Sequence, residues 1–109
     1  MGGYGTYAAA LDHPEKIAAI LPLCGGINDS DTTRICTLRD IPILTYHGTA
    51  DDQISIYETE RIVNSLEECN GEIIFHRLTG KGHSIQYLYE TEPWIYEWLL
   101  MHRKAITNE

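Results

Sequence analysis

The chain has 109 residues, of which 16 are acidic and 8 are basic, so its formal net charge is −8. This acidic balance argues against nucleic acid or an anionic membrane surface as a partner, because both call for clustered Lys and Arg. No apolar run approaches the roughly 20 residues of a membrane span. Hydrophobic and charged contents of 43% and 22% are typical of a globular protein, and the length predicts a single domain over residues 1–109.

The three cysteines, Cys24, Cys36 and Cys69, lack the C-x-x-C spacing of a zinc or redox site. Their odd number rules out complete pairing, and we expect three reduced thiols. No charged segment followed by an apolar stretch marks a signal peptide. Together these features favour a cytoplasmic chain, and no cofactor is expected.

The first 40 residues predict a helix, a strand and a loop, in that order. A helical run over residues 4–13 stops at Pro14, and the apolar residues 17–23 read as a buried strand with Pro22 near its end. Residues 24–31 form a loop rich in Gly, Asn and Asp. Residues 32–40 are ambiguous, with one short helical turn as the expectation.

The remaining residues repeat the alternation of strand and helix. Residues 41–47 are rich in β-branched and aromatic side chains and predict a second strand. Residues 55–69 place apolar side chains at a period near 3.6, which is typical of an amphipathic helix, and Asn70-Gly71 supplies its end. A third strand is expected over residues 72–78, and a last helix over residues 93–103.

Apolar strands that alternate with helices indicate an α/β fold with a parallel sheet. We expect a three-layer structure in which a small, mostly parallel sheet of about three strands is flanked by helices. The first strand is apolar and is expected at an edge of the sheet. Such an edge is a surface for self-association.

Two polar residues follow neighbouring strands of this sheet. Asp51 comes after the second strand, and His83 comes after the third, in the loop Gly80-Lys81-Gly82. Because the carboxyl ends of parallel strands meet at one rim, these two side chains are expected to lie close together. An Asp that orients a His supplies two of the three members of a nucleophilic relay, with His83 as general base and acid.

The third member of such a relay is a nucleophile on a turn of the form G-x-S-x-G. The chain begins Met1-Gly2-Gly3, which fits the residues that follow the serine, and no serine precedes them. Gly2 and Gly3 would allow close packing at a strained turn. The backbone nitrogen after the nucleophile, here Met1, would help to hold the oxyanion.

Four stretches together resemble the C-terminal half of an α/β-hydrolase, from the esterase and "predicted peptidase" group near dienelactone hydrolase and feruloyl or acetyl esterases. They are Met1-Gly2-Gly3-Tyr4-Gly5-Thr6-Tyr7, residues 13–20 with Cys24-Gly25-Gly26, residues 47–56, and residues 93–100. The resemblance implies a partial α/β-hydrolase fold that hydrolyses small carboxylic esters. It makes Asp51 the acid and His83 the base, and it places the serine immediately before Met1, so the missing N-terminal half is an expected partner.

Several other readings of these residues stay open. Asp51 could cap the following helix with the help of Asp52, and Cys24 could act as a nucleophile at the same rim. A metal site from His47, Asp51, Asp52 and His83 has permitted ligand types but no recognised spacing. A non-catalytic module that forms a homodimer through the edge strand is the alternative function.

Overall fold

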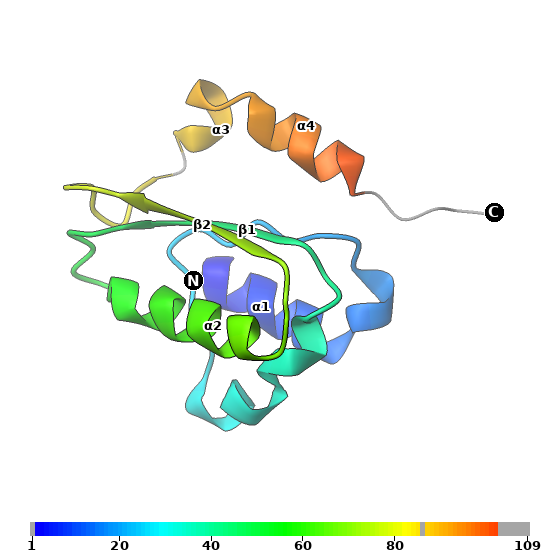
Figure 1. Ribbon diagram of the computed structural model, residues 1–109. Helices are drawn as coiled ribbons and strands as arrows, with labels where there is room; N and C mark the ends of the chain where they lie inside the picture. Colours follow the sequence, from blue (N-terminus) through cyan, green and yellow to red (C-terminus); the bar gives the residue numbers. More distant parts are fainter. Residues whose placement is uncertain (1, 86, 103–109) are drawn as a thin grey trace.

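A computed structural model of the chain describes residues 2–85 and 87–102 (Figure 1). The elements, in chain order, are α1 (Gly2–Asp12), the 3₁₀ helices η1 (Pro14–Lys16) and η2 (Asp29–Leu38), β1 (Ile43–Gly48), α2 (Ile56–Glu68), β2 (Ile73–Leu78), α3 (Leu88–Thr91) and α4 (Trp94–Met101). The strands lie between α1 and α2 on one side and α3 and α4 on the other, which confirms the three-layer α/β fold. Within the described part of the chain, no helix is long and apolar enough to cross a membrane.

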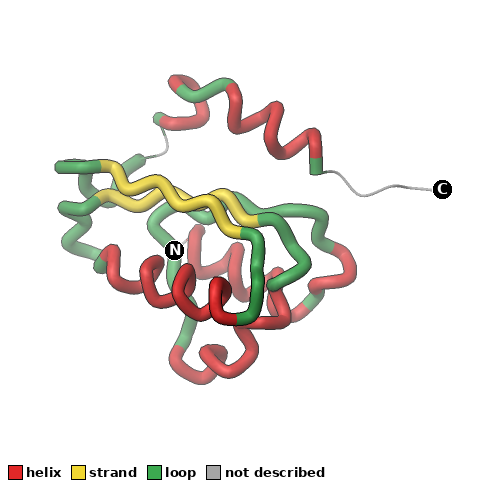
Figure 2. Tube along the Cα trace, in the orientation of Figure 1, coloured by secondary structure: helices red, strands yellow, loops and turns green. Residues whose placement is uncertain are grey.

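The sheet consists of β1 and β2, which run parallel and side by side (Figure 2). Their register pairs Ile43 with Ile73 at one end and Gly48 with Leu78 at the other, and α2 is the crossover between them. Every residue of β1 is buried, whereas β2 has alternating exposed residues. β1 is therefore the central strand, and its carboxyl end lies inside the protein.

The predicted first strand is present only as two isolated parallel bridges, Ile20 to Ile43 and Leu23 to Tyr46. The backbone nitrogen of Ile20 donates to the carbonyl of Pro42, just before β1, at 3.1 Å, and that of Cys24 donates to the carbonyl of Tyr46 in β1 at 2.9 Å. Between them stands Pro22, which has no N–H and interrupts the ladder. The segment thus pairs with β1 in the predicted parallel sense without forming a continuous strand.

The core has one cluster of buried side chains on each face of the sheet. Ile43 of β1 packs with α1, η2 and α2, including Tyr7, Ile62 and Leu66. The next residue, Leu44, points to the opposite face and packs with Ile95 and Trp98 of α4. This alternation follows from the two-residue period of a strand, and it fixes β1 between both helical layers.

The helix α2 begins and ends where the sequence indicates. Ser55 is its N-cap, and its hydroxyl oxygen accepts a hydrogen bond from the backbone nitrogen of Tyr57 at 3.2 Å. At the other end Asn70 has a φ of 63°, a left-handed conformation that ends helices. The ambiguous segment 32–40 belongs mostly to η2, and the short helix α3 was not predicted.

A disulfide joins Cys36 of η2 to Cys69 at the end of α2, so the prediction of three reduced thiols is wrong. The two Cα atoms are 6.2 Å apart across a separation of 33 residues. An odd count excludes only complete pairing, and the sequence gives no sign that η2 packs beside α2. Cys24 alone among the three is free, and it is buried. Because reduced thiols had supported a cytoplasmic chain, that support is removed.

Candidate active site

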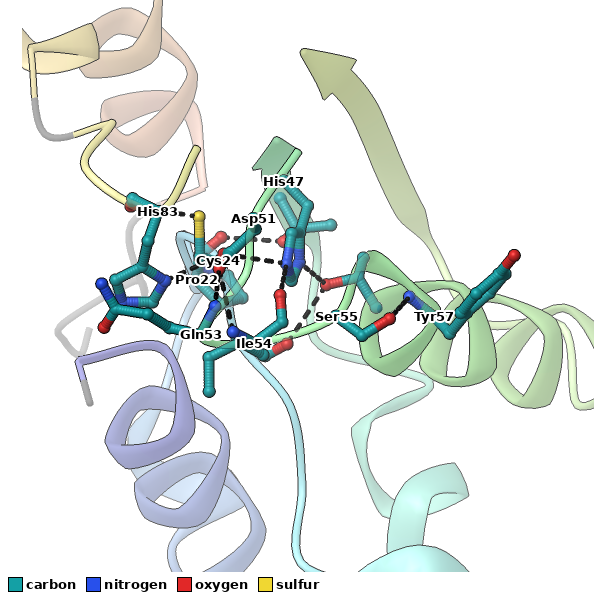
Figure 3. Close-up of polar contacts among 12 residues, drawn as sticks. Pro22, Cys24, His47, Asp51, Gln53, Ile54, Ser55, Tyr57 and His83 are labelled. Atoms are coloured by element: carbon teal, nitrogen blue, oxygen red, sulfur yellow. Dashed lines mark hydrogen bonds and ion pairs between the residues drawn. The ribbon is translucent and has the colours of Figure 1, made fainter. Parts of the chain in front are cut away.

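Asp51 and His83 meet at the carboxyl end of the sheet, as expected. Asp51 lies three residues beyond the end of β1, and His83 lies five residues beyond the end of β2. Their side chains point toward each other, and Nδ1 of His83 is 2.8 Å from Oδ2 of Asp51 (Figure 3). The parallel register of the two strands therefore brings together residues that are 32 positions apart in the sequence.

Backbone contacts hold the two loops that carry these side chains against each other. The nitrogen of Thr49 donates to the Leu78 carbonyl at 3.1 Å, and the nitrogen of Ala50 donates to the Lys81 carbonyl at 2.9 Å. A Cβ at Gly48 would overlap the carbonyl of Lys81, so the loops can approach this closely only at a glycine. The geometry of the Asp51–His83 pair is thus set by backbone as well as by side chains.

The carboxylate of Asp51 is fully buried and hydrogen-bonded on both oxygens. Oδ1 accepts from the backbone nitrogens of Gln53 and Ile54 at 2.9 and 2.8 Å, while Oδ2 faces His83. Burial by itself raises the pKa of Asp51, but the hydrogen bonds from Ile54, His83 and Gln53 outweigh it and lower the pKa to about 2. Asp51 is therefore an anion at neutral pH. Since Ser55 caps α2, Asp51 is not the helix cap.

The position of Asp51 fixes the tautomer of His83. An ionised carboxylate accepts hydrogen bonds and donates none, so Nδ1 of the neutral imidazole must carry its proton. Nε2 then keeps its lone pair and is free to accept a proton. The His83 side chain is 20% exposed, so a substrate can reach the imidazole.

His47 is a second imidazole beside the same carboxylate, and the sequence reasoning missed this contact. Its side chain is fully buried at the end of β1. Nε2 lies 2.8 Å from the carbonyl of Ile54 and 3.3 Å from Oδ2 of Asp51, so it carries a proton. Nδ1 lies 2.7 Å from the hydroxyl of Thr59 in α2. In Figure 3 His83 and His47 stand on either side of Asp51.

The signal for His47 in the sequence is its position four residues before Asp51, at the end of a predicted strand. That spacing alone does not bring the ring to the carboxylate, because the contact also requires the turn in which the nitrogen of Asp51 donates to the Gly48 carbonyl at 3.3 Å. The second hydrogen bond of Thr59, at 3.2 Å to the carbonyl of Gly25, extends the same network to the loop after residue 23.

Cys24 lies at the same rim but is poorly placed to be a nucleophile. Its thiol donates to the backbone carbonyl of His83 at 3.4 Å. This hydrogen bond is to the backbone of His83, so it does not join the thiol to the imidazole ring. Burial, with a smaller contribution from the negative charge of Asp51, raises the pKa of the Cys24 thiol to about 11. The thiol is therefore protonated at neutral pH, whereas a nucleophilic cysteine needs its thiolate.

Potential ligand atoms of Cys24, His47 and Asp51 lie within 4.8 Å of one another, and these are the residues that could hold a metal ion. They do not fit this role well in the observed arrangement. Nε2 of His47 donates its proton to the Ile54 carbonyl, and the Cys24 thiol faces the carbonyl of His83, so both groups are engaged by backbone carbonyls. The group also differs from the set considered from the sequence, because it includes Cys24 and lacks Asp52 and His83.

The glycines expected at the nucleophile turn lie in the first turn of α1, which begins at Gly2. Gly3 is buried against the backbone of Leu23 and Gly25, where any Cβ would overlap the Cα of Gly25. Gly3 is therefore closely packed, but inside a helix, and its place in a strained nucleophile turn stays a prediction. Met1 lies outside the described residues.

Comparisons with known proteins identify the family and the fold. The phospholipase/carboxylesterase family matches residues 1–90. A thermostable esterase superposes with a TM-score of 0.82 at 28% identity, over 94% of this chain and 29% of that protein. SOBER1 of Arabidopsis thaliana shares the fold, with a TM-score of 0.70 at 24% identity, over 94% of this chain and 49% of that protein.

An uncharacterized secreted protein of Arthroderma benhamiae is 23% identical over 75% of this chain, and the match covers 12% of that protein. The chain thus spans half or less of the length of each of these relatives. The family match nevertheless covers most of the chain, including Asp51 and His83. The chain belongs to the phospholipase/carboxylesterase family and has part of the α/β-hydrolase fold.

Proposed function

We propose that this chain is the acid- and base-bearing part of a serine hydrolase of carboxylesterase type, which acts on small carboxylic esters. The hydrogen bond between Asp51 and His83 at the carboxyl end of the parallel strands is the observation that carries the proposal. Membership of the phospholipase/carboxylesterase family and the likeness to a thermostable esterase support it.

In the proposed reaction, Nε2 of His83 takes the proton of a serine hydroxyl while the serine oxygen attacks the ester carbonyl. The same proton then passes to the leaving alcohol, and a second round with water releases the acid. Asp51 stays ionised throughout, because its low pKa keeps the proton on the imidazole. It holds the imidazole in the required tautomer and stabilises the imidazolium.

The serine in this proposal is supplied by residues outside this chain. The close packing of Gly3 on Gly25 is what a tight turn before α1 requires, and it supports a nucleophile directly before Met1. The nitrogen of Met1 would then be one donor to the oxyanion. The nucleotide codons upstream of Met1 test this part, and an in-frame Gly-x-Ser is the expected result.

Hydrolysis of p-nitrophenyl acetate tests the reaction itself. We expect turnover by the chain extended with the residues encoded upstream, none by the chain alone, and loss of turnover in the extended His83→Ala variant. The matched control is His13→Ala, which removes an imidazole whose side chain is 62% exposed. Turnover that survives His83→Ala, or an extended protein that is inactive while folded, would overturn the proposal.

The non-catalytic alternative, a homodimer through the edge of segment 17–23, stays a prediction. That segment pairs with β1 on one side through its two bridges. Size-exclusion chromatography with light scattering tests this alternative, since a strictly monomeric chain would contradict the dimer.

A further inference from the structure

A second chain of hydrogen bonds begins on the side of Asp51 that faces away from His83 (Figure 3). Nε2 of His47 lies 3.3 Å from Oδ2 of Asp51, and Nδ1 of His47 lies 2.7 Å from the hydroxyl of Thr59. Thr59 in turn contacts the carbonyl of Gly25 at 3.2 Å. The side chains of Asp51, His47 and Thr59 are fully buried, so bulk water does not compete for these contacts.

We propose that His47 and Thr59 are positioning residues for the proposed reaction. Thr59 holds the ring of His47, and His47 holds the carboxylate of Asp51 in the orientation that His83 requires. The proposal rests on the proposed function and adds to it two residues that act through Asp51 and do not touch the substrate. Such residues matter for the rate, because a displacement of about 1 Å among catalytic groups can cost about 100-fold.

The carboxylate of Asp51 is held by donors on both of its oxygens. Oδ1 accepts from the backbone nitrogens of Gln53 and Ile54, whereas Oδ2 lies between the two imidazoles. Without His47, Oδ2 would lose the donor that opposes His83, and the carboxylate could turn together with the ring it has to orient. A reacting group is held precisely only when the residue that supports it is itself fixed by packing and hydrogen bonds.

The hydroxyl of Thr59 determines which way the buried ring of His47 faces. Nε2 of His47 carries the proton that faces the Ile54 carbonyl and Asp51, so in the neutral ring Nδ1 accepts the hydrogen of the Thr59 hydroxyl. A ring turned by half a rotation would present C–H groups to Thr59 and Asp51 instead. Thr59 lies at a fully buried position of α2, where a hydroxyl is costly unless it is hydrogen-bonded. Its contacts with His47 and Gly25 offset that cost.

The contact of Thr59 with Gly25 reaches the loop on which α1 begins. Gly25 lies so close to Gly3 that a Cβ at Gly3 would overlap the Cα of Gly25. In the proposed reaction the serine directly precedes this first turn of α1, so Gly25 is part of the support behind the nucleophile. Thr59 therefore connects that support to the ring that holds the acid, and it helps to set the distance between the two sides of the relay.

Thr59→Val tests the role of this chain of contacts, because valine has nearly the volume of threonine and lacks the hydroxyl. The matched control is Thr45→Val: Thr45 is also fully buried, and its hydroxyl donates to the Pro22 carbonyl at 2.8 Å. Each variant removes a buried hydroxyl, so a purely structural role predicts similar effects of the two on stability and on turnover. Thr59→Ser keeps the hydroxyl and should retain function. If Thr59→Val does not fold, Thr59→Ser against Thr59→Ala makes the same comparison with a smaller side chain.

Turnover is measured with p-nitrophenyl acetate on the protein extended with the residues encoded upstream. Thr59→Val should lower kcat at least tenfold with KM within twofold, because Thr59 does not touch the substrate. Thr45→Val and Thr59→Ser should keep kcat within threefold of the unmodified protein. Adding Thr59→Val to Asp51→Asn should lower kcat by no more than a further twofold, since Thr59 acts through Asp51. Equal kcat in Thr59→Val and Thr45→Val, or a full tenfold loss on top of Asp51→Asn, would refute the proposal.

A second measurement needs no serine, so it separates this proposal from the proposed function. The NMR signal of the proton on Nδ1 of His83 reports the hydrogen bond to Asp51 in the chain itself. Thr59→Val should move this signal, whereas Thr45→Val and Thr59→Ser should leave it in place. An unmoved signal in Thr59→Val would refute the positioning role even if the extended protein is an esterase. A moved signal, with no turnover by the folded extended protein, would refute the proposed reaction and leave the positioning of Asp51 intact.

Discussion

Nδ1 of His83 lies 2.8 Å from Oδ2 of Asp51, although the two residues come from loops that follow different strands. The contact depends on the parallel register of β1 and β2, which ends with Gly48 opposite Leu78. It also depends on Gly48, whose lack of a side chain lets the loop at Lys81 approach. The pair is thus a product of sheet topology, and it leaves Nε2 of His83 available to a substrate.

The first prediction concerns the tautomer of His83. In the neutral state its proton should be on Nδ1, because Asp51 only accepts hydrogen bonds. Long-range ¹H–¹⁵N correlation spectra distinguish the two ring nitrogens directly. In Asp51→Asn the proton of neutral His83 should move to Nε2, since an amide can donate to Nδ1. Asp52→Asn, at an exposed residue, is the control. A neutral His83 protonated on Nε2 would contradict the geometry.

The second prediction concerns stability in acid. The pKa of Asp51 is about 2, below the value of about 3.9 for an unfolded chain. The carboxylate therefore stabilises the fold fully above pH 4, and this contribution of about 2 kcal/mol is lost as the pH falls from 4 through 2. Urea unfolding of Asp51→Asn should show a smaller decline than the unmodified chain over this range. An equal decline in both would show that Asp51 is not stabilised in this way.

The third prediction concerns His47, which is fully buried and contacts Ile54, Thr59 and Asp51. His47→Ala should lower the free energy of unfolding by about 2–4 kcal/mol, because it opens a cavity and leaves buried polar groups without partners. Urea denaturation measures the effect, and His13→Ala, at a side chain that is 62% exposed, is the control. A loss for His47→Ala no larger than that of the control would refute the role of this network.

The fourth prediction concerns the disulfide between Cys36 and Cys69. Its removal by Cys36→Ser with Cys69→Ser should lower the free energy of unfolding by about 2–4 kcal/mol, since it closes a long loop in the unfolded chain. Thiol labelling after denaturation without reductant should modify one cysteine per chain, Cys24. Labelling of three cysteines in protein prepared under oxidising conditions would show that the disulfide does not form.

The fifth prediction compares two glycines in the same helix. Gly3→Ala should destabilise the fold by at least about 1 kcal/mol, because its Cβ would overlap Gly25 and the Leu23 carbonyl. Gly5→Ala meets no atom within 4 Å and should be neutral or stabilising by up to about 1 kcal/mol. Thermal unfolding measures both. If Gly3→Ala were as stable as Gly5→Ala, that result would contradict the close packing of α1 on the loop at Gly25.

The sequence was sufficient for the features that depend on periodicity and on strand ends. The amphipathic stripe of α2 and its end at Asn70 were predictable, and so was the meeting of Asp51 with His83, since parallel strands place their carboxyl ends together. Pro22 was expected only near the end of the first strand, and it interrupts the ladder there.

Features that depend on how elements pack were not predictable. The disulfide requires η2 to lie beside the end of α2, and nothing in the spacing of Cys36 and Cys69 shows this. The contact of His47 with Asp51 depends on the turn from Gly48 to Asp51, whose geometry no periodic pattern encodes.

The central claim is that Asp51 orients a catalytic His83. Hydrolysis of p-nitrophenyl acetate by the extended protein and by its Asp51→Asn variant tests it most directly. The account predicts that kcat falls by about 10⁴ in a variant that remains folded, as expected when the imidazole is held in the wrong tautomer. A folded Asp51→Asn variant with kcat within a few fold of the unmodified protein would contradict it.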